Sequence, residues 1–252
     1  MISIFDHPLV SSRYFFPPRS VPKQLVHVDV DGAVLGCAAY VSAPDAPWLV
    51  HFHGNGEVVS DYEEDLAPRL LTAGLNVFFA EYRGYGASTG SPAMVTMLGD
   101  VPRILSAVGV SPDRVVVYGR SVGSIYAIEA AYRTPTIRGL VIESGIASPL
   151  ERILFRVRPE ELGVTSADLE RDAKLHLDHA VKLGAFPGKT LVLHAANDTM
   201  VVRSHAERNS AWAKNSELVL YERGDHNDIL AWNLDDIVAR VARLAHGESG
   251  SK

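Results

Sequence analysis

The chain has 252 residues, of which 47% are hydrophobic and 21% are charged, a composition typical of one globular domain with a sizeable core. Its formal net charge of −6, without any run of Lys and Arg, argues against a nucleic-acid partner. The single cysteine, Cys37, excludes a disulfide framework and a thiolate metal cluster. We therefore expect one domain over residues 1–252 that needs no cofactor or metal.

The first residues, Met1–Pro8, lack a basic region followed by an apolar stretch, so no secretory signal is predicted. No apolar run is long enough to span a bilayer. A cysteine cluster or terminal lipidation motif that could tether the chain to a membrane is also missing from the sequence. These features predict a cytoplasmic protein without a stable membrane anchor.

A β-hairpin is predicted first, because apolar and polar residues alternate over 25–30, Asp31-Gly32 provides a turn, and 33–41 resumes the extended pattern. Short apolar runs separated by stretches of helical periodicity follow. The runs are 49–52, 77–80, 115–118, 140–142, 191–193 and 218–220. Since buried parallel strands are apolar on both faces, the runs predict a mostly parallel sheet with an antiparallel edge.

Helices are predicted between the strands, which gives an alternating α/β order. Their expected ranges are 61–73, 95–108, 122–133, 203–214 and 229–245. Right-handed crossovers would bring the functional loops to the carboxyl ends of the strands. The connection over residues 144–189 is too long for a plain crossover, so we expect a small cap there, between the sixth and seventh strands, that selects the substrate.

The pattern Gly-x-Ser-x-Gly occurs at 86–90 and at 119–123. A nucleophile elbow needs a strand that runs straight into a helix through a tight turn. Ser121 follows a strong predicted strand and precedes a predicted helix, whereas Ser88 is soon followed by Ser91-Pro92, which favours a turn. Ser121 is therefore the candidate nucleophile, with a helix-capping serine as the alternative.

His226 is the candidate general base, because it lies between the last predicted strand and the last helix and follows the serine and the acid in the order that this motif requires. The alternative is a histidine that only caps the helix. Three other histidines, His176, His179 and His205, are expected at the surface or in the cap.

Asp198 follows the strand at 191–193, where its carboxylate could accept the imidazole N–H and fix the tautomer of the histidine. The alternative role is a helix cap. Glu143, directly after another strand, is the rival acid. Asp225 and Asp228 are less favoured because they crowd His226.

An oxyanion hole needs two preorganised N–H donors. Val122, directly after the nucleophile, would supply one, and Asn55 in the turn 53–57 the other, because the glycines of that turn allow close approach to the substrate. His53 is expected to support the turn. His51 and His53 have no third ligand at a useful spacing, so no zinc site is predicted.

Four segments together carry a resemblance to a known family: His53–Gly56, Tyr82–Gly90, Tyr118–Gly123 and His226–Ile229. The chain resembles the serine α/β-hydrolases of the Bem46-like group, which includes ABHD13-type and ABHD17-type enzymes. The resemblance implies an α/β-hydrolase fold with an eight-stranded sheet, hydrolysis of a carboxylic ester or thioester, and the same three catalytic residues.

The chain departs from this group in three ways. It lacks the N-terminal cysteine cluster of the ABHD17-like depalmitoylases, so depalmitoylation at a membrane does not follow. The second position of its elbow is Arg120, and the loop before the acid reads Ala195-Ala196-Asn197.

The sequence predicts a serine esterase or thioesterase that acts on a small acyl substrate through an acyl-enzyme on Ser121. An amidase or peptidase with the same triad, or a non-catalytic binding protein of this fold, are the alternatives.

Overall fold

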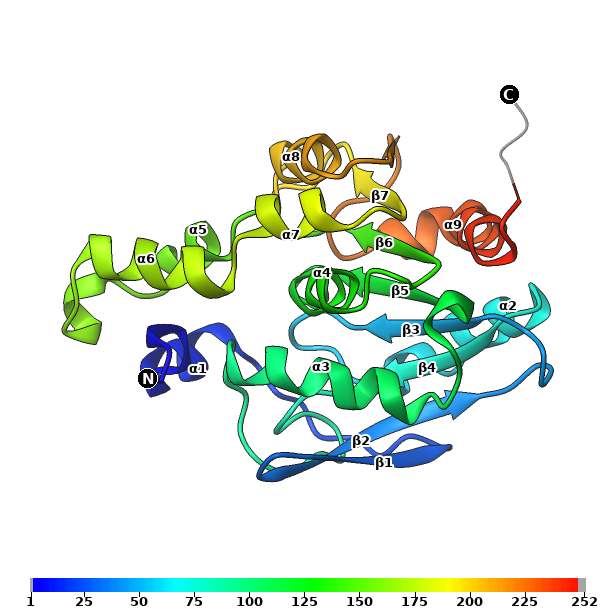
Figure 1. The fold of residues 1–252 in the computed structure, drawn as a ribbon, viewed down its shortest axis with the longest axis horizontal. Helices are drawn as coiled ribbons and strands as arrows, with labels where there is room; N and C mark the ends of the chain where they lie inside the picture. Colours follow the sequence, from blue (N-terminus) through cyan, green and yellow to red (C-terminus); the bar gives the residue numbers. More distant parts are fainter. Residues whose placement is uncertain (1, 249–252) are drawn as a thin grey trace.

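The computed structural model describes residues 2–248 and is built on an eight-stranded sheet in the order β1-β2-β4-β3-β5-β6-β7-β8 (Figure 1). The strands are β1 (Leu25–Val30), β2 (Ala33–Tyr40), β3 (Trp48–Phe52), β4 (Asn76–Ala80), β5 (Val115–Arg120), β6 (Gly139–Glu143), β7 (Lys189–Ala195) and β8 (Ser216–Tyr221). β3 to β8 run parallel, and β2 joins β1 and β4 in antiparallel fashion. The predicted mostly parallel sheet with a hairpin at its edge is confirmed.

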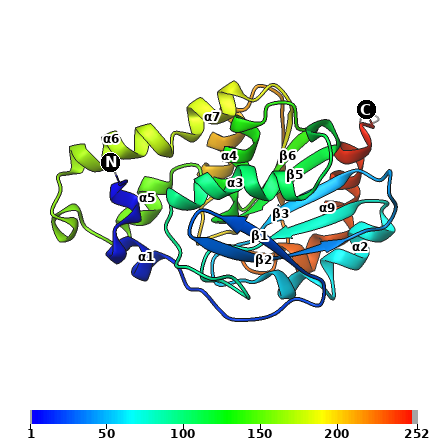
Figure 2. The same ribbon diagram turned by 60° about the horizontal axis from the view of Figure 1, so that its bottom comes forward.

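Helices cover both faces of the sheet, as Figures 1 and 2 show. One layer contains α3 (Thr96–Ala107), α4 (Gly123–Arg133), α7 (His179–Ala185) and α8 (Ser204–Trp212), and the other contains α2 (Leu66–Thr72) and α9 (Ile229–His246). Successive strand residues point to opposite faces. In β3, Val50 therefore packs into the core under α3 and α4, and Leu49 packs into the core under α2 and α9. This is why the strands read as unbroken apolar runs.

Four of the predicted helices match α3, α4, α8 and α9 to within two residues at each end. The helix predicted from residue 61 begins only at Leu66, and a short 3-10 helix, η2 (Val59–Tyr62), precedes it. The separation has a local cause, because Asp61 Oδ2 accepts a hydrogen bond of 2.9 Å from Val58 N and closes its own turn.

The connection between β6 and β7 forms α5 (Pro149–Leu154), the 3-10 helix η4 (Pro159–Leu162), α6 (Ser166–His176) and α7. Beside α6 lie the N-terminal elements η1 (Ile4–Asp6) and α1 (Pro8–Tyr14) (Figure 2). Asp172 of α6 accepts hydrogen bonds from Ser3 Oγ and Ile4 N. The hydrophobic pattern does not predict α1, and its packing brings the N-terminal segment to the same end of the sheet as the insertion.

No helix within residues 2–248 has both the length and the apolar content needed to cross a lipid bilayer.

Candidate active site

Ser121 lies in the turn between β5 and α4 with a φ of 50°, a left-handed conformation that is strained for a residue with a side chain. Its flanking glycines are required by close packing. A Cβ on Gly123 would lie 2.1 Å from the Phe52 carbonyl oxygen, and one on Gly119 would lie 2.6 Å from Ala127 Cβ. The turn therefore presses against β3 and α4 and presents the serine at the carboxyl end of the sheet.

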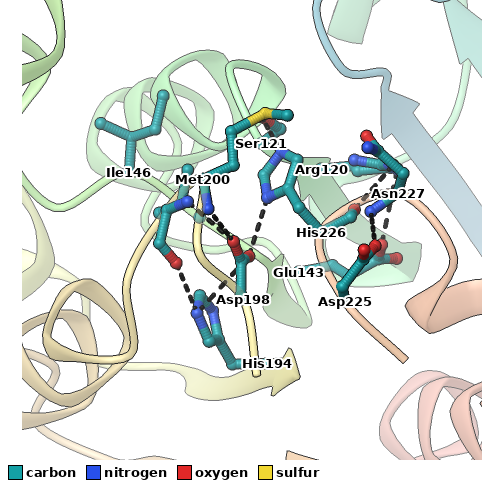
Figure 3. Close-up of polar contacts among 12 residues, drawn as sticks. Arg120, Ser121, Glu143, Ile146, His194, Asp198, Met200, Asp225, His226 and Asn227 are labelled. Carbon is teal, nitrogen blue, oxygen red and sulfur yellow. Dashed lines mark hydrogen bonds and ion pairs between the residues drawn. The ribbon is translucent and has the colours of Figure 1, made fainter. Parts of the chain in front are cut away.

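Three side chains from separate loops form a continuous hydrogen-bonded chain (Figure 3). Ser121 Oγ lies 2.9 Å from His226 Nε2, and His226 Nδ1 lies 2.7 Å from Asp198 Oδ2. Asp198 comes from the loop after β7 and His226 from the loop after β8. Because the carboxylate accepts a hydrogen bond from the Nδ1–H group, the proton of the neutral imidazole stays on Nδ1, and Nε2 is free to accept the serine proton.

Asp198 is itself held in place. Its Oδ1 accepts hydrogen bonds from Met200 N at 2.9 Å and Val201 N at 2.7 Å, and His194 Nε2 donates to the Val201 carbonyl at 2.8 Å. Burial acts to raise the pKa of Asp198, but the hydrogen bond and charge of His226 outweigh it and the pKa lies below its usual value. The group is therefore an ionised acceptor at neutral pH.

The rival carboxylates are engaged elsewhere. Glu143 accepts a hydrogen bond from the Tyr118 hydroxyl, and its Oε1 lies 3.5 Å from Arg120 Nε. Burial raises its pKa. Asp225 and Asp228 bond within their own turn, since Asp225 N donates to Asp228 Oδ1 at 2.6 Å. Among residues 2–248, Asp198 is the carboxylate that bonds the His226 ring.

Arg120, next to the nucleophile, is a buried residue whose role the sequence reasoning missed. Its Nη2 donates to the His226 carbonyl at 3.1 Å and lies 3.1 Å from Glu57 Oε1, while Nε faces Glu143. Burial disfavours the charge, but Glu143 and Glu57 outweigh it and raise the arginine pKa. One guanidinium therefore ties the elbow to the histidine loop and to the turn after β3. The sequence signal that could have indicated this role is the charged residue between the two glycines of the elbow, Gly119 and Gly123.

The turn after β3 is anchored mainly by the Asn55 side chain. Its Oδ1 accepts hydrogen bonds from the Tyr85 hydroxyl at 2.7 Å and from Phe16 N at 3.1 Å, and its Nδ2 donates to the Tyr14 carbonyl. The backbone N–H groups of Asn55 and Val122 have no partner within residues 2–248, and both residues line the same cavity as Ser121. Both amides are thus left to donate to a bound group.

His53 supports this turn as expected, because Nδ1 bonds the Gly54 carbonyl at 2.7 Å and Nε2 bonds Glu81 Oε1 at 2.6 Å. Burial acts to lower the pKa of His53, but the Glu81 carboxylate outweighs it and raises the pKa. Within the described part of the chain, no group of three or more His, Cys, Asp or Glu side chains is arranged to hold a metal ion.

The expectation that His205 lies at the surface or in the cap is wrong. His205 belongs to α8 and is buried, and its Nδ1 accepts a hydrogen bond of 3.0 Å from Ala147 N. His179 lies in the insertion as expected, and it is also buried, with Nδ1 donating to the Ile146 carbonyl at 2.8 Å.

The Ser121 side chain opens into a cavity of about 310 Å³. The N-terminal segment, the β6–β7 insertion and the loops after β3, β5, β7 and β8 all contribute to its wall. The lining residues are Tyr14, Phe16, Asn55, Glu57, Arg120, Ser121, Val122, Ile146, Arg152, Arg156, Met200, Val201, His226 and Asn227. The sequence reasoning did not identify Tyr14 or Phe16, because nothing in the pattern brings the first twenty residues to the site.

The chain is similar in sequence to proteins whose names describe hydrolases. The family described as Hydrolase_4, "Serine aminopeptidase, S33", matches residues 43–159. The human alpha/beta hydrolase domain-containing protein 17C is 28% identical over 205 residues, which cover 77% of this chain and 57% of that protein. The uncharacterized protein YfhR of Escherichia coli K12 is 25% identical over 196 residues, covering 75% of this chain and 66% of YfhR. The chain thus spans less than two thirds of these relatives.

Solved structures show the same fold at low identity. Est1E from Butyrivibrio proteoclasticus aligns with a TM-score of 0.74 and 16% identity, covering 88% of this chain and 98% of Est1E. Mouse alpha/beta hydrolase domain-containing protein 10 aligns with a TM-score of 0.72 and 15% identity, covering 90% and 100%. The predicted α/β-hydrolase fold and the resemblance to ABHD17-type proteins are confirmed, and the matches support a hydrolase.

Proposed function

We propose that this α/β-hydrolase-fold chain is a serine hydrolase that cleaves a carboxylic ester or thioester through an acyl-enzyme on Ser121. The observation that carries the proposal is the hydrogen-bonded chain from Ser121 through His226 to Asp198 at the wall of a cavity. An unactivated serine is a weak nucleophile, and an adjacent base that is oriented by a carboxylate is the arrangement that activates it.

In the proposed mechanism, His226 Nε2 takes the Ser121 proton while Oγ attacks the carbonyl carbon. The N–H groups of Asn55 and Val122 stabilise the oxyanion. The protonated His226 then gives its proton to the departing alcohol or thiol. Water, deprotonated by the same imidazole, attacks the acyl-enzyme. The imidazolium then returns the proton to Ser121 Oγ as the bond to the acyl group breaks and the acid is released.

We propose the insertion over residues 144–189 as the cap of this single-domain enzyme. It contributes Ile146, Arg152 and Arg156 to the cavity wall. The substrate is a small acyl compound, since the cavity of about 310 Å³ lies at the lower end of the range for small-molecule sites.

The description of the matching family raises an aminopeptidase as the second candidate. An aminopeptidase needs a free carboxylate to hold the substrate ammonium. Glu57 is the carboxylate of the cavity lining, and it already accepts hydrogen bonds from Gly54 N and the Tyr62 hydroxyl and pairs with Arg120. The chemistry of the wall therefore favours an ester or thioester over a peptide with a free amino terminus.

The test is hydrolysis of p-nitrophenyl esters of graded acyl length by the unmodified chain and by Ser121→Ala. We expect the highest kcat/KM for short acyl chains and a loss of at least about 10³-fold in the variant. Equal rates in both proteins would contradict the serine mechanism. Hydrolysis of amino-acid p-nitroanilides without any ester hydrolysis would favour the aminopeptidase.

A further inference from the structure

Two guanidinium groups from the insertion lie in the wall of the Ser121 cavity. Arg152 belongs to α5, and Arg156 follows two residues after its end. Across residues 2–248, neither guanidinium forms an ion pair or donates a hydrogen bond. Other arginines near them are paired, since Arg208 meets Glu151 at 2.7 Å and Arg158 meets Glu161 at 3.7 Å.

The positive charge of the wall is not balanced. Arg120, Arg152 and Arg156 are the cations of the lining, and Glu57 is its carboxylate. Glu57 and Glu143 both face Arg120, which leaves Arg152 and Arg156 without counter-charge. In a chain whose net charge is −6, two such cations beside a nucleophile mark a local positive field.

Each of the two guanidinium groups lies over an aromatic ring. Arg152 Cζ lies 5.2 Å from the centroid of the Phe155 ring, and Arg156 Cζ lies 5.5 Å from that of Phe16. Both arginines also act electrostatically on the Tyr14 hydroxyl. Burial raises the pKa of this hydroxyl to about 12, and the positive charges of the two arginines oppose that increase. Stacking orients an arginine and leaves its N–H donors free, so the pair is preorganised to bind an anion.

We propose that the substrate of Ser121 carries an anionic group, a carboxylate or a phosphate, which Arg152 and Arg156 bind while the scissile carbonyl lies at Ser121. This inference rests on the proposed serine hydrolase function and adds the substrate class. Guanidinium groups bind both anions through paired N–H donors. Arg152 is half-buried and Arg156 exposed, which places the anion toward the mouth of the cavity and the reacting carbonyl deeper.

The test compares anionic esters with uncharged esters of similar structure. For an anion on the acyl part, p-nitrophenyl hydrogen adipate is compared with p-nitrophenyl methyl adipate. For an anion on the leaving group, 4-acetoxybenzoate and 4-acetoxyphenyl phosphate are compared with methyl 4-acetoxybenzoate. The measured quantity is the ratio of kcat/KM for the anionic ester to that for its neutral partner.

We expect the ratio to exceed one in at least one arm and to fall about tenfold or more in the double variant Arg152→Gln/Arg156→Gln, because each guanidinium–anion contact is a charge-assisted hydrogen bond. The matched control is Arg158→Gln/Arg171→Gln, which also removes two positive charges, from exposed and carboxylate-paired arginines outside the cavity. It should leave the ratio unchanged. The arm that responds identifies where the anion lies and whether carboxylate or phosphate is preferred.

Ser121-dependent hydrolysis of the neutral esters, with ratios that are the same in the unmodified chain and the double variant, would overturn the anionic substrate and leave the serine hydrolase standing. A fall of equal size in Arg158→Gln/Arg171→Gln would also overturn it, because the effect would then be one of general charge. If no ester is hydrolysed in a Ser121-dependent way, the proposed function and the inference both fail.

Discussion

Each of the two carboxylate oxygens of Asp198 has its own role. Its Oδ2 accepts a hydrogen bond from His226 Nδ1–H, and its Oδ1 accepts hydrogen bonds from the backbone N–H groups of Met200 and Val201, which fixes the loop after β7. An amide in its place would present a donor to Nδ1 and favour the tautomer with the proton on Nε2. That tautomer cannot accept the serine proton.

We predict that Asp198→Asn lowers kcat for ester hydrolysis by about 10³- to 10⁴-fold, with the fold kept as judged by circular dichroism. The comparison is Glu143→Gln, which changes the carboxylate that faces Arg120 and Tyr118 and should cost much less activity. Full activity in a folded Asp198→Asn protein would move the role of acid to Glu143.

At the scale of elements, the site depends on the N-terminal segment as well as on the sheet. The chain from α1 to Phe16 packs on the turn after β3 through the Asn55 side chain. In the proposed mechanism the backbone N–H of Asn55 donates to the oxyanion. It can do so only if the turn keeps its position, because the donor must lie within hydrogen-bond distance of the oxyanion.

We predict that Asn55→Ala, which keeps the backbone N–H but removes the bonds to Phe16, Tyr14 and Tyr85, lowers kcat about tenfold with little change in KM. Steady-state kinetics on one short ester measures the effect. Tyr85→Phe removes one bond to Asn55 and the bond that Phe16 N donates to the Tyr85 hydroxyl, but it keeps the other bonds of the Asn55 side chain and should lower kcat less. An unchanged kcat in Asn55→Ala would show that the turn holds its position without the side chain.

How far the sequence predicts these elements depends on where their stability comes from. The six parallel strands and α4 carry their own apolar pattern, because both faces of the sheet are covered, and they are found within a few residues. The placement of η1 beside α6 instead depends on contacts between distant segments, such as Ser3 with Asp172. The positions of Ser121, His226 and Asp198 follow from the order of the strands. The roles of Arg120, Arg152 and Arg156 depend on tertiary contacts, which the sequence pattern does not show.

At the scale of the whole molecule, buried neutral histidines make the folded state sensitive to acid. Burial lowers the pKa of His179 to about 3 and that of His205 to about 4. In the unfolded chain these two histidines take up protons as the pH falls below about 6.5. In the folded chain they stay neutral until the pH approaches their lowered pKa values. Stability is therefore lost progressively as the pH falls through that window.

We predict that unfolding in urea at pH 5 costs less free energy than at pH 7, and that His179 alone accounts for about 2 kcal/mol of the difference. His179→Gln should shrink the difference by about that amount. The control is His27→Gln, at an exposed position on β1, which should not. A difference that is unchanged in His179→Gln would contradict this source of acid sensitivity.

A fluorophosphonate probe tests the proposed activation of Ser121 without any knowledge of the natural substrate, because it reacts with activated serines in general. Trypsin cuts after Arg120 and Arg133 and would release residues 121–133, so mass spectrometry can place the adduct. We expect one adduct on Ser121, none in Ser121→Ala, and much slower labelling in His226→Ala. A well-folded protein that takes up no probe, or that is labelled equally in Ser121→Ala, would contradict the account and favour a binding protein that keeps the fold.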